Sequence, residues 1–164
     1  MGFWIFGKKS WKPEQHTVSG KSVPLSTYVP IWSEAVDAMR ALSETENSDD
    51  YEESVRELAS ATRNLHDKRK LLETVRPEES ALKSVHIKSV ALLQCVNEMH
   101  DSVLQRAMLP IEGRDIRDSQ SLAERSRKFE ALVERLQLEL AEEMIKLQRN
   151  NPGLSAQFDS LIPQ

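Results

Sequence analysis

Apolar residues recur every three or four positions over most of this chain, and that spacing constrains its fold more than any other feature. Side chains at this spacing fall on one face of an α-helix, so each stretch predicts a helix with one buried stripe. Breaks rich in proline, glycine or clustered polar residues separate the stretches, near residues 46–50, 77, 110–115 and 151–153. The sequence therefore predicts an all-α fold, an antiparallel up-down helical bundle of three long helices with a shorter N-terminal helix.

The breaks also set the expected helix boundaries. Pro30 fits the first position of the short helix, which is expected to run to about Glu44. Ser48 or Asp49 is expected to cap the second helix, which continues to about Val75. Apolar residues of this second helix alternate in steps of four and three, which is the heptad seam of a coiled coil.

The third and fourth helices follow from later breaks. Pro77 is expected to begin the third helix, and two alternatives stay open there: a tight turn or a kink in one continuous helix. The third helix has the widest apolar face, so it is expected to be the most buried. Ser121 followed by Glu124 three residues later is a capping-box candidate for the fourth helix, which Asn151–Gly153 is expected to end.

The same pattern predicts one helical domain with two less regular ends. Residues 1–27 lack helical periodicity and contain Gly20 and Pro24, so we expect an irregular or flexible N-terminal arm. Residues 28–150 are expected to form the helical bundle. Residues 151–164 are expected to form a C-terminal tail, with one short helix docked on the bundle as the alternative to an irregular end.

The sequence predicts no catalytic residues, no cofactor and no metal site, and it favours a non-enzymatic protein. Gly20–Ser22 resembles the end of a phosphate-binding loop, but Gln15 stands where that motif needs its first glycine. His86 and His100 lie about 21 Å apart along one helix and so cannot share a metal ion. The single cysteine, Cys95, excludes an internal disulfide framework.

One alternative assigns a function to the two histidines and the cysteine. His86, Cys95 and His100 all fall in the third predicted helix, where a pocket between helices would place them beside side chains of a neighbouring helix. Such a pocket would belong to a small enzyme or a ligand-binding helical bundle, because helical bundles build their sites from facing helices.

Charge is distributed unevenly along the chain. The formal net charge is −4, but residues 1–21 contain four lysines and one glutamate and carry +3, which leaves −7 for the rest. An acidic protein is not expected to bind nucleic acid through bulk electrostatics. A basic tip on an acidic body predicts instead that the two parts meet different partners.

Aromatic and basic residues are concentrated in residues 3–12, which we call the aromatic-basic segment. The residues expected to contact a membrane or a partner are Phe3, Trp4, Ile5, Phe6, Lys8, Lys9, Trp11 and Lys12. Aromatic rings favour the membrane interface, and lysines are attracted to anionic headgroups, so the segment is expected to lie on a membrane without spanning it. Three alternatives stay open: docking in a groove of the helical body, binding to another protein, or a frayed tail.

These patterns favour a non-enzymatic interaction or adaptor protein, attached peripherally to a membrane by the aromatic-basic segment. The expected partners are one or more proteins, an anionic membrane surface and a second copy of the chain in a homodimer; nucleic acid is not an expected partner. The chain shows no pattern of a secretory signal peptide, and a lone cysteine fits a reducing compartment. The expected location is therefore the cytoplasm, at the inner face of a membrane.

Overall fold

The computed structural model describes residues 20–44, 49–113 and 117–164. The aromatic-basic segment lies outside these residues. Within them the chain is mostly helical, with five α-helices and very little strand, so the all-α prediction is confirmed. No helix in this part of the chain is long and apolar enough to cross a membrane.

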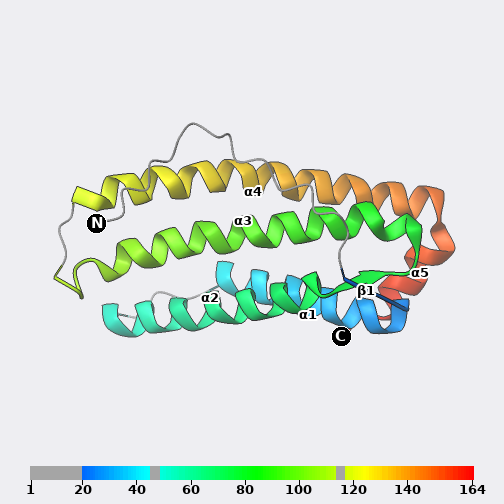
Figure 1. Cartoon of the computed structure of the whole chain (residues 1–164), viewed down its shortest axis with the longest axis horizontal. Helices are drawn as coiled ribbons and strands as arrows, with labels where there is room; N and C mark the ends of the chain where they lie inside the picture. Colours follow the sequence, from blue (N-terminus) through cyan, green and yellow to red (C-terminus); the bar gives the residue numbers. More distant parts are fainter. Residues whose placement is uncertain (1–19, 45–48, 114–116) are drawn as a thin grey trace.

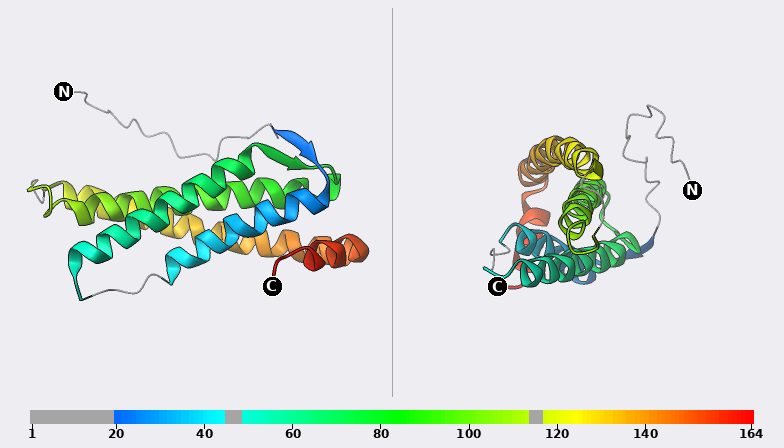
Figure 2. Two further views of the ribbon diagram at one scale, coloured as in Figure 1. Left: turned by 90° about the horizontal axis from the view of Figure 1, so that it is seen from below. Right: turned by 90° about the vertical axis from the view of Figure 1, so that its left-hand side faces the viewer.

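The elements follow one another as β1 (Lys21–Val23), α1 (Leu25–Ser43), α2 (Tyr51–Glu73), β2 (Val75–Pro77), a 3-10 turn (Ser80–Leu82), α3 (Lys83–Met108), α4 (Arg117–Asn150) and α5 (Pro152–Ser160). The three long helices α2, α3 and α4 extend along the longest axis of the molecule (Figure 1). Seen end-on, α4 lies on one side of α3, while α1 and α2 lie on the other (Figure 2).

The third helix is the core of the molecule, as its wide apolar face predicted. α3 packs against α1, α2 and α4, and it carries more buried residues than any other described helix. Two hydrogen bonds join its polar side chains to α1: Trp32 Nε1 donates to Ser89 Oγ at 2.8 Å, and Tyr28 Oη lies 3.0 Å from His86 Nδ1. Because buried polar groups are costly without partners, such pairs fix how the helices align.

The first helix begins earlier than the sequence predicted. α1 starts at Leu25, and Pro30 lies inside the helix and not at its first position. The reason is burial, because Tyr28 and Val29 are fully buried and extend the apolar stripe toward the N-terminus. The prediction that residues 1–27 form an irregular arm is therefore wrong for residues 21–27, which form β1 and the start of α1.

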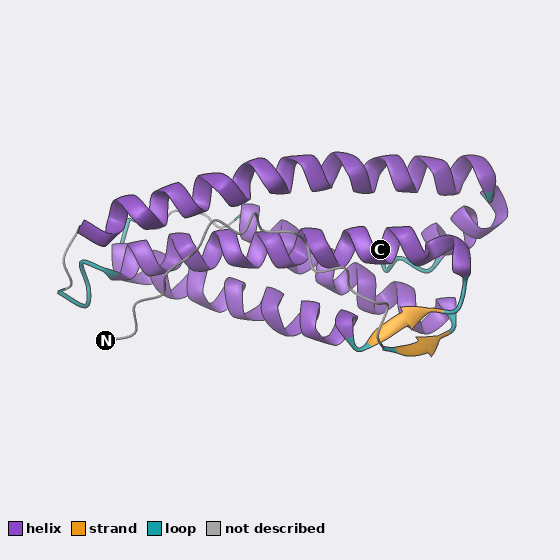
Figure 3. Cartoon of the chain, turned by 45° about the horizontal axis from the view of Figure 1, so that its top comes forward, coloured by secondary structure: helices purple, strands orange, loops and turns teal. Residues whose placement is uncertain are grey.

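A short parallel sheet of β1 and β2, which the sequence did not predict, closes one end of the molecule (Figure 3). Lys21 N donates to Thr74 O at 2.9 Å, and Glu78 N donates to Val23 O at 3.0 Å. Gly20 has a φ of 129°, and a Cβ there would lie 3.1 Å from the backbone of Thr74, so this close approach requires glycine. The sheet holds Gly20 against the end of α2.

The sheet also corrects the expected start of the third helix. α2 ends at Glu73 and α3 begins at Lys83, so Pro77 is neither the first residue of a helix nor a kink in a continuous one. Pro77 is the last residue of β2, where a residue without a backbone N–H is tolerated because the sheet has only two strands.

Two further boundaries differ in detail. Asp50 and not Asp49 caps α2, accepting hydrogen bonds at 2.9 and 3.3 Å from backbone N–H groups of the first turn. The fourth helix begins at Arg117, before the capping-box candidate at Ser121. It ends at Asn150, where the Asn-Pro-Gly sequence predicted its end.

Candidate docking site

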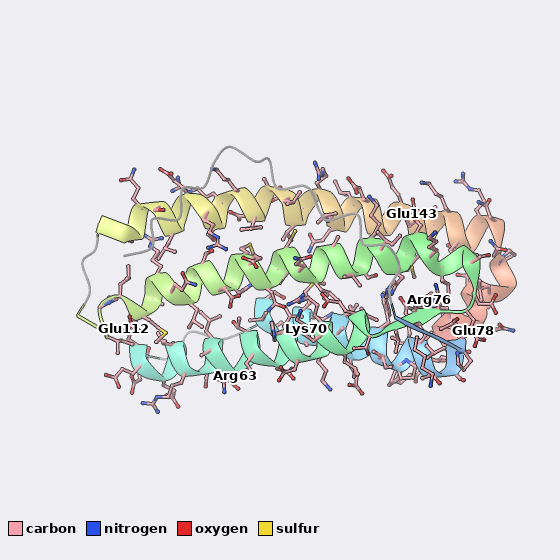
Figure 4. The ribbon with its side chains drawn as sticks, in the orientation of Figure 1. Arg63, Lys70, Arg76, Glu78, Glu112 and Glu143 are labelled. Carbon is pink, nitrogen blue, oxygen red and sulfur yellow. The ribbon has the colours of Figure 1, made fainter. Side chains whose placement is uncertain are left out.

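The two ends of the molecule are built differently. The sheet and α5 lie at one end, which we call the strand end; at the other end α2 begins, α3 ends and α4 begins (Figure 1). Glu112 marks this second end in Figure 4, and Arg76 and Glu78 mark the strand end.

A pocket of about 360 Å³ opens at the end opposite the strands, and we call it the end pocket. Its lining comes from three helices and one turn: Tyr51, Val103, Arg106, Ala107, Leu109, Pro110 and Ser119. This volume falls within the range of about 300 to 1,000 Å³ that is typical of ligand pockets.

Two polar groups at the end pocket, the Tyr51 hydroxyl and the Arg106 Nε, are hydrogen-bonded within the protein. Tyr51 Oη donates to the Ala107 carbonyl at 2.5 Å, which ties α2 to α3. Arg106 Nε donates to Ser119 Oγ at 2.9 Å, which ties α3 to α4. The remaining lining is largely carbon, so the pocket is suited to an apolar occupant.

Exposed apolar side chains gather at this end. The large hydrophobic residues that are strongly exposed in the described part of the chain are Tyr51, Leu71, Val103, Ile111, Leu138 and Ile145. Tyr51, Val103 and Ile111 line or adjoin the end pocket and are 52%, 39% and 47% exposed. Single exposed hydrophobic residues are ordinary on protein surfaces, but a cluster around a concave site indicates binding.

Acidic residues surround the same end. Asp49, Asp50, Glu52 and Glu53 occupy the start of α2 on either side of Tyr51, and all four are exposed. Glu112 follows the pocket residues Leu109 and Pro110 and is also exposed. Among the described residues, the bases nearby are Arg106 in the lining and Arg56, which lies 3.7 Å from Glu52. Acids outnumber bases within this described set, so the rim of the end pocket beside Tyr51 attracts positive charge.

His86, Cys95 and His100, the three residues of the alternative pocket prediction, each have a separate environment. His86 is buried and has its Tyr28 hydrogen bond and an edge-on ring contact, with ring centroids 5.6 Å apart. Cys95 is fully buried, and burial raises the pKa of its thiol to about 12. His100 Nδ1 donates to the Val96 carbonyl of its own helix at 2.9 Å.

This arrangement gives the three residues no shared chemistry. A thiol with a pKa of about 12 stays protonated and is a poor nucleophile at neutral pH. None of the three residues lines the end pocket. Within the described ranges, no group of three or more histidine, cysteine, aspartate or glutamate residues is placed to hold a metal ion.

The polar interior between α2 and α3 was missed by sequence reasoning. Arg69, which interrupts the heptad seam, is buried and donates from Nε to Asn97 Oδ1 at 3.0 Å. Arg69 also pairs with Glu73 at 2.5 Å, and Asn97 Nδ2 donates to the Thr62 carbonyl at 3.3 Å. Every buried side-chain nitrogen or oxygen of the described residues has a hydrogen-bond partner, so this interior holds the helices together.

Comparisons with known protein families, with curated protein sequences and with solved structures find no match to this chain. The residues of the aromatic-basic segment, from Phe3 to Lys12, lie outside the described part, so their expected membrane or partner contacts stay predictions.

Proposed function

We propose that this protein is a non-enzymatic interaction or adaptor protein that binds apolar side chains in the end pocket and contacts an anionic membrane through its aromatic-basic segment. The observation that carries the proposal is the chemistry of the pocket lining. Its carbon surface is open, whereas the Tyr51 hydroxyl and the Arg106 Nε are already bonded within the protein. Such a site gains free energy by burying apolar surface, about 25 cal/mol for each Å² removed from water.

The membrane part of the proposal is supported by sequence. The aromatic-basic segment combines four aromatic residues and one isoleucine with three lysines. Each lysine near an anionic surface contributes about 1 kcal/mol, and aromatic rings add apolar burial at the interface. Because anionic lipids are concentrated in the cytoplasmic leaflet, we place the protein in the cytoplasm at the inner face of a membrane.

The proposal takes the long helices to form an antiparallel up-down bundle. Supporting this, α2, α3 and α4 lie side by side, and the chain between α3 and α4 is short compared with the helices it joins (Figure 1). A bundle of this kind would carry the end pocket at one end and Gly20, the first described residue of the chain, at the other.

The test measures binding of the uncharged apolar dye Nile red in a full-length variant with Phe3→Ser, Trp4→Ser and Phe6→Ser, which we call the triple-serine variant. The serines are needed because the aromatic residues would themselves bind an apolar dye. Val103→Glu and Leu138→Glu are then compared in this background. Both place a carboxylate on an exposed apolar position, but only Val103 lines the end pocket.

We expect Val103→Glu to weaken dye binding about fivefold, which corresponds to about 1 kcal/mol of lost apolar burial. Leu138→Glu should leave dye binding unchanged, because Leu138 is an exposed residue of α4 outside the pocket lining. Equal dye binding by the triple-serine variant with and without Val103→Glu would show that the end pocket is not a binding site.

A further inference from the structure

We infer that the aromatic residues Phe3, Trp4 and Phe6 of this chain occupy the end pocket in the free protein, so that the pocket withholds them from a membrane. The inference rests on the proposed function, because it names the occupant of the proposed binding site. Three observations carry it: the length of chain before Gly20, the carbon lining of the pocket and the acidic rim beside it.

The first observation is reach. Gly20 is held beside Thr74 at the C-terminal end of α2, whereas Tyr51 in the pocket lining is the first residue of α2. The 23 residues of α2 span about 34 Å, because each residue of a helix adds about 1.5 Å. A segment of this chain that occupies the pocket must therefore be able to extend at least about 34 Å from Gly20.

The residues before Gly20 differ in how far they can extend from it. Phe6 lies 14 positions before Gly20 and can extend about 46 to 50 Å from it, and Phe3 can extend farther. Trp11 lies only nine positions away and can extend no more than about 32 Å. Phe3, Trp4 and Phe6 therefore reach the end pocket with chain to spare, whereas Trp11 approaches it only if the chain between Trp11 and Gly20 is fully extended.

The second and third observations concern complementarity. The lining offers apolar surface beside the half-exposed side chains of Tyr51 and Val103, which suits an aromatic ring. Lys8 and Lys9 follow Phe6 closely in sequence, so rings placed in the pocket bring these lysines to its rim. That rim carries the four acids at residues 49–53, and opposite charges attract there.

The experiment traps the contact as a disulfide in the full-length chain. Gly2→Cys adds a thiol beside Phe3 without removing an aromatic residue, and Ile111→Cys adds its partner at the pocket. Ile145→Cys is the matched control, because Ile145 and Ile111 are similarly exposed, 54% and 47%. Cys95 can stay in place in both variants, since its thiol is fully buried and protonated.

The control position, Ile145, favours disulfide formation when the N-terminal segment is not docked. Ile145 lies near the end of α4, and α4 ends at the strand end, where Gly20 is held (Figure 1). A chain of 18 residues with no preferred contact has an average end-to-end distance of only about 21 to 25 Å, so Gly2 would stay nearer the strand end. An undocked segment therefore gives Gly2→Cys/Ile145→Cys at least as much disulfide as Gly2→Cys/Ile111→Cys.

We expect the Ile111 pair to form its disulfide at least about fivefold faster than the Ile145 pair, because docking raises the effective concentration at the pocket. Adding Trp4→Ser and Phe6→Ser should abolish this preference. Equal rates for the two pairs, or a faster Ile145 pair, would overturn the inference. That result together with dye binding that depends on Val103 would leave the proposed function standing, with a partner or lipid as occupant of the pocket.

Discussion

Replacing Phe158 by alanine tests whether α5 is an integral part of the fold. Phe158 is fully buried, and its ring meets Trp32 edge-on, with centroids 4.9 Å apart and an interplanar angle of 72°. Removing a phenylalanine ring from a core costs about 3 to 5 kcal/mol, of which an aromatic pair accounts for about 0.5 to 1.5. Through this ring contact α5, a helix of only nine residues, packs against Trp32 of α1.

The loss is large against the total stability of a domain, about 5 to 15 kcal/mol. For a chain of this size each kcal/mol lowers the melting temperature by about 2 to 4 °C, so Phe158→Ala should lower it by about 6 to 20 °C. Urea unfolding followed by far-UV circular dichroism gives the free energy of unfolding directly, and thermal unfolding checks it.

Phe129→Ala is the matched control. Phe129 lies on α4, is only partly buried and has Arg125 over its ring at 5.8 Å from the centroid. Its removal should cost less than half as much as the removal of Phe158, because less apolar surface returns to water. Equal losses of less than about 1 kcal/mol for both variants would refute the packing of α5 described above.

Three further predictions follow from local chemistry. Cys95 should react with a thiol reagent at least about a hundredfold more slowly in the native protein than in urea, since burial raises its pKa to about 12; comparable rates would place the thiol at the surface. Burial and, after it, the charge of Glu98 raise the pKa of Asp101 above its value in the unfolded chain. The Asp101 carboxyl group therefore contributes stability below its unfolded pKa, and this contribution is lost as the pH rises through its folded pKa. Asp101→Asn should therefore gain stability relative to wild type between about pH 4 and pH 7 in urea unfolding, and a relative loss would reverse the assigned sign. Gly20→Ala should lower the free energy of unfolding by about 1 to 3 kcal/mol, because φ is 129° and its Cβ would crowd Thr74; an unchanged urea midpoint would contradict this.

The helices could be predicted from sequence because their signals are local. The three- and four-residue spacing of apolar side chains predicts the class of fold. The Asn-Pro-Gly sequence at residues 151–153 ends α4 through its own backbone preferences, which do not depend on the packing of that helix. The start of α1 at Leu25 could not be predicted in this way, since it depends on the burial of Tyr28 and Val29 against other elements.

The sheet and the polar interior depend on residues far apart in the chain. Val23 and Val75 are both buried in strands of only three residues, too short to leave a periodic pattern. Arg69 interrupts the heptad seam, and its contacts with Glu73 and with Asn97 of α3 explain how a charged residue is accommodated there. Nothing within the heptad itself identifies Asn97 as a partner.

The end pocket was also beyond sequence reasoning. Its residues come from α2, α3, α4 and the turn after α3, and no local motif joins them. One weak signal was available, the run Leu109-Pro110-Ile111, where apolar residues continue into a break that is expected to be polar. The aromatic-basic segment was singled out by composition alone, because its aromatic residues and lysines are concentrated within ten positions.

Liposome flotation tests most directly whether the aromatic-basic segment serves both the end pocket and a membrane. Full-length wild type, Val103→Glu, Leu138→Glu and the triple-serine variant are each mixed with phosphatidylcholine vesicles, with and without phosphatidylserine. The account predicts that wild type floats only with the anionic vesicles, that Val103→Glu floats more strongly, and that Leu138→Glu matches wild type. The triple-serine variant should stay at the bottom of the gradient. Flotation of the triple-serine variant at the wild-type level, or failure of wild type and Val103→Glu alike to float, would contradict the account.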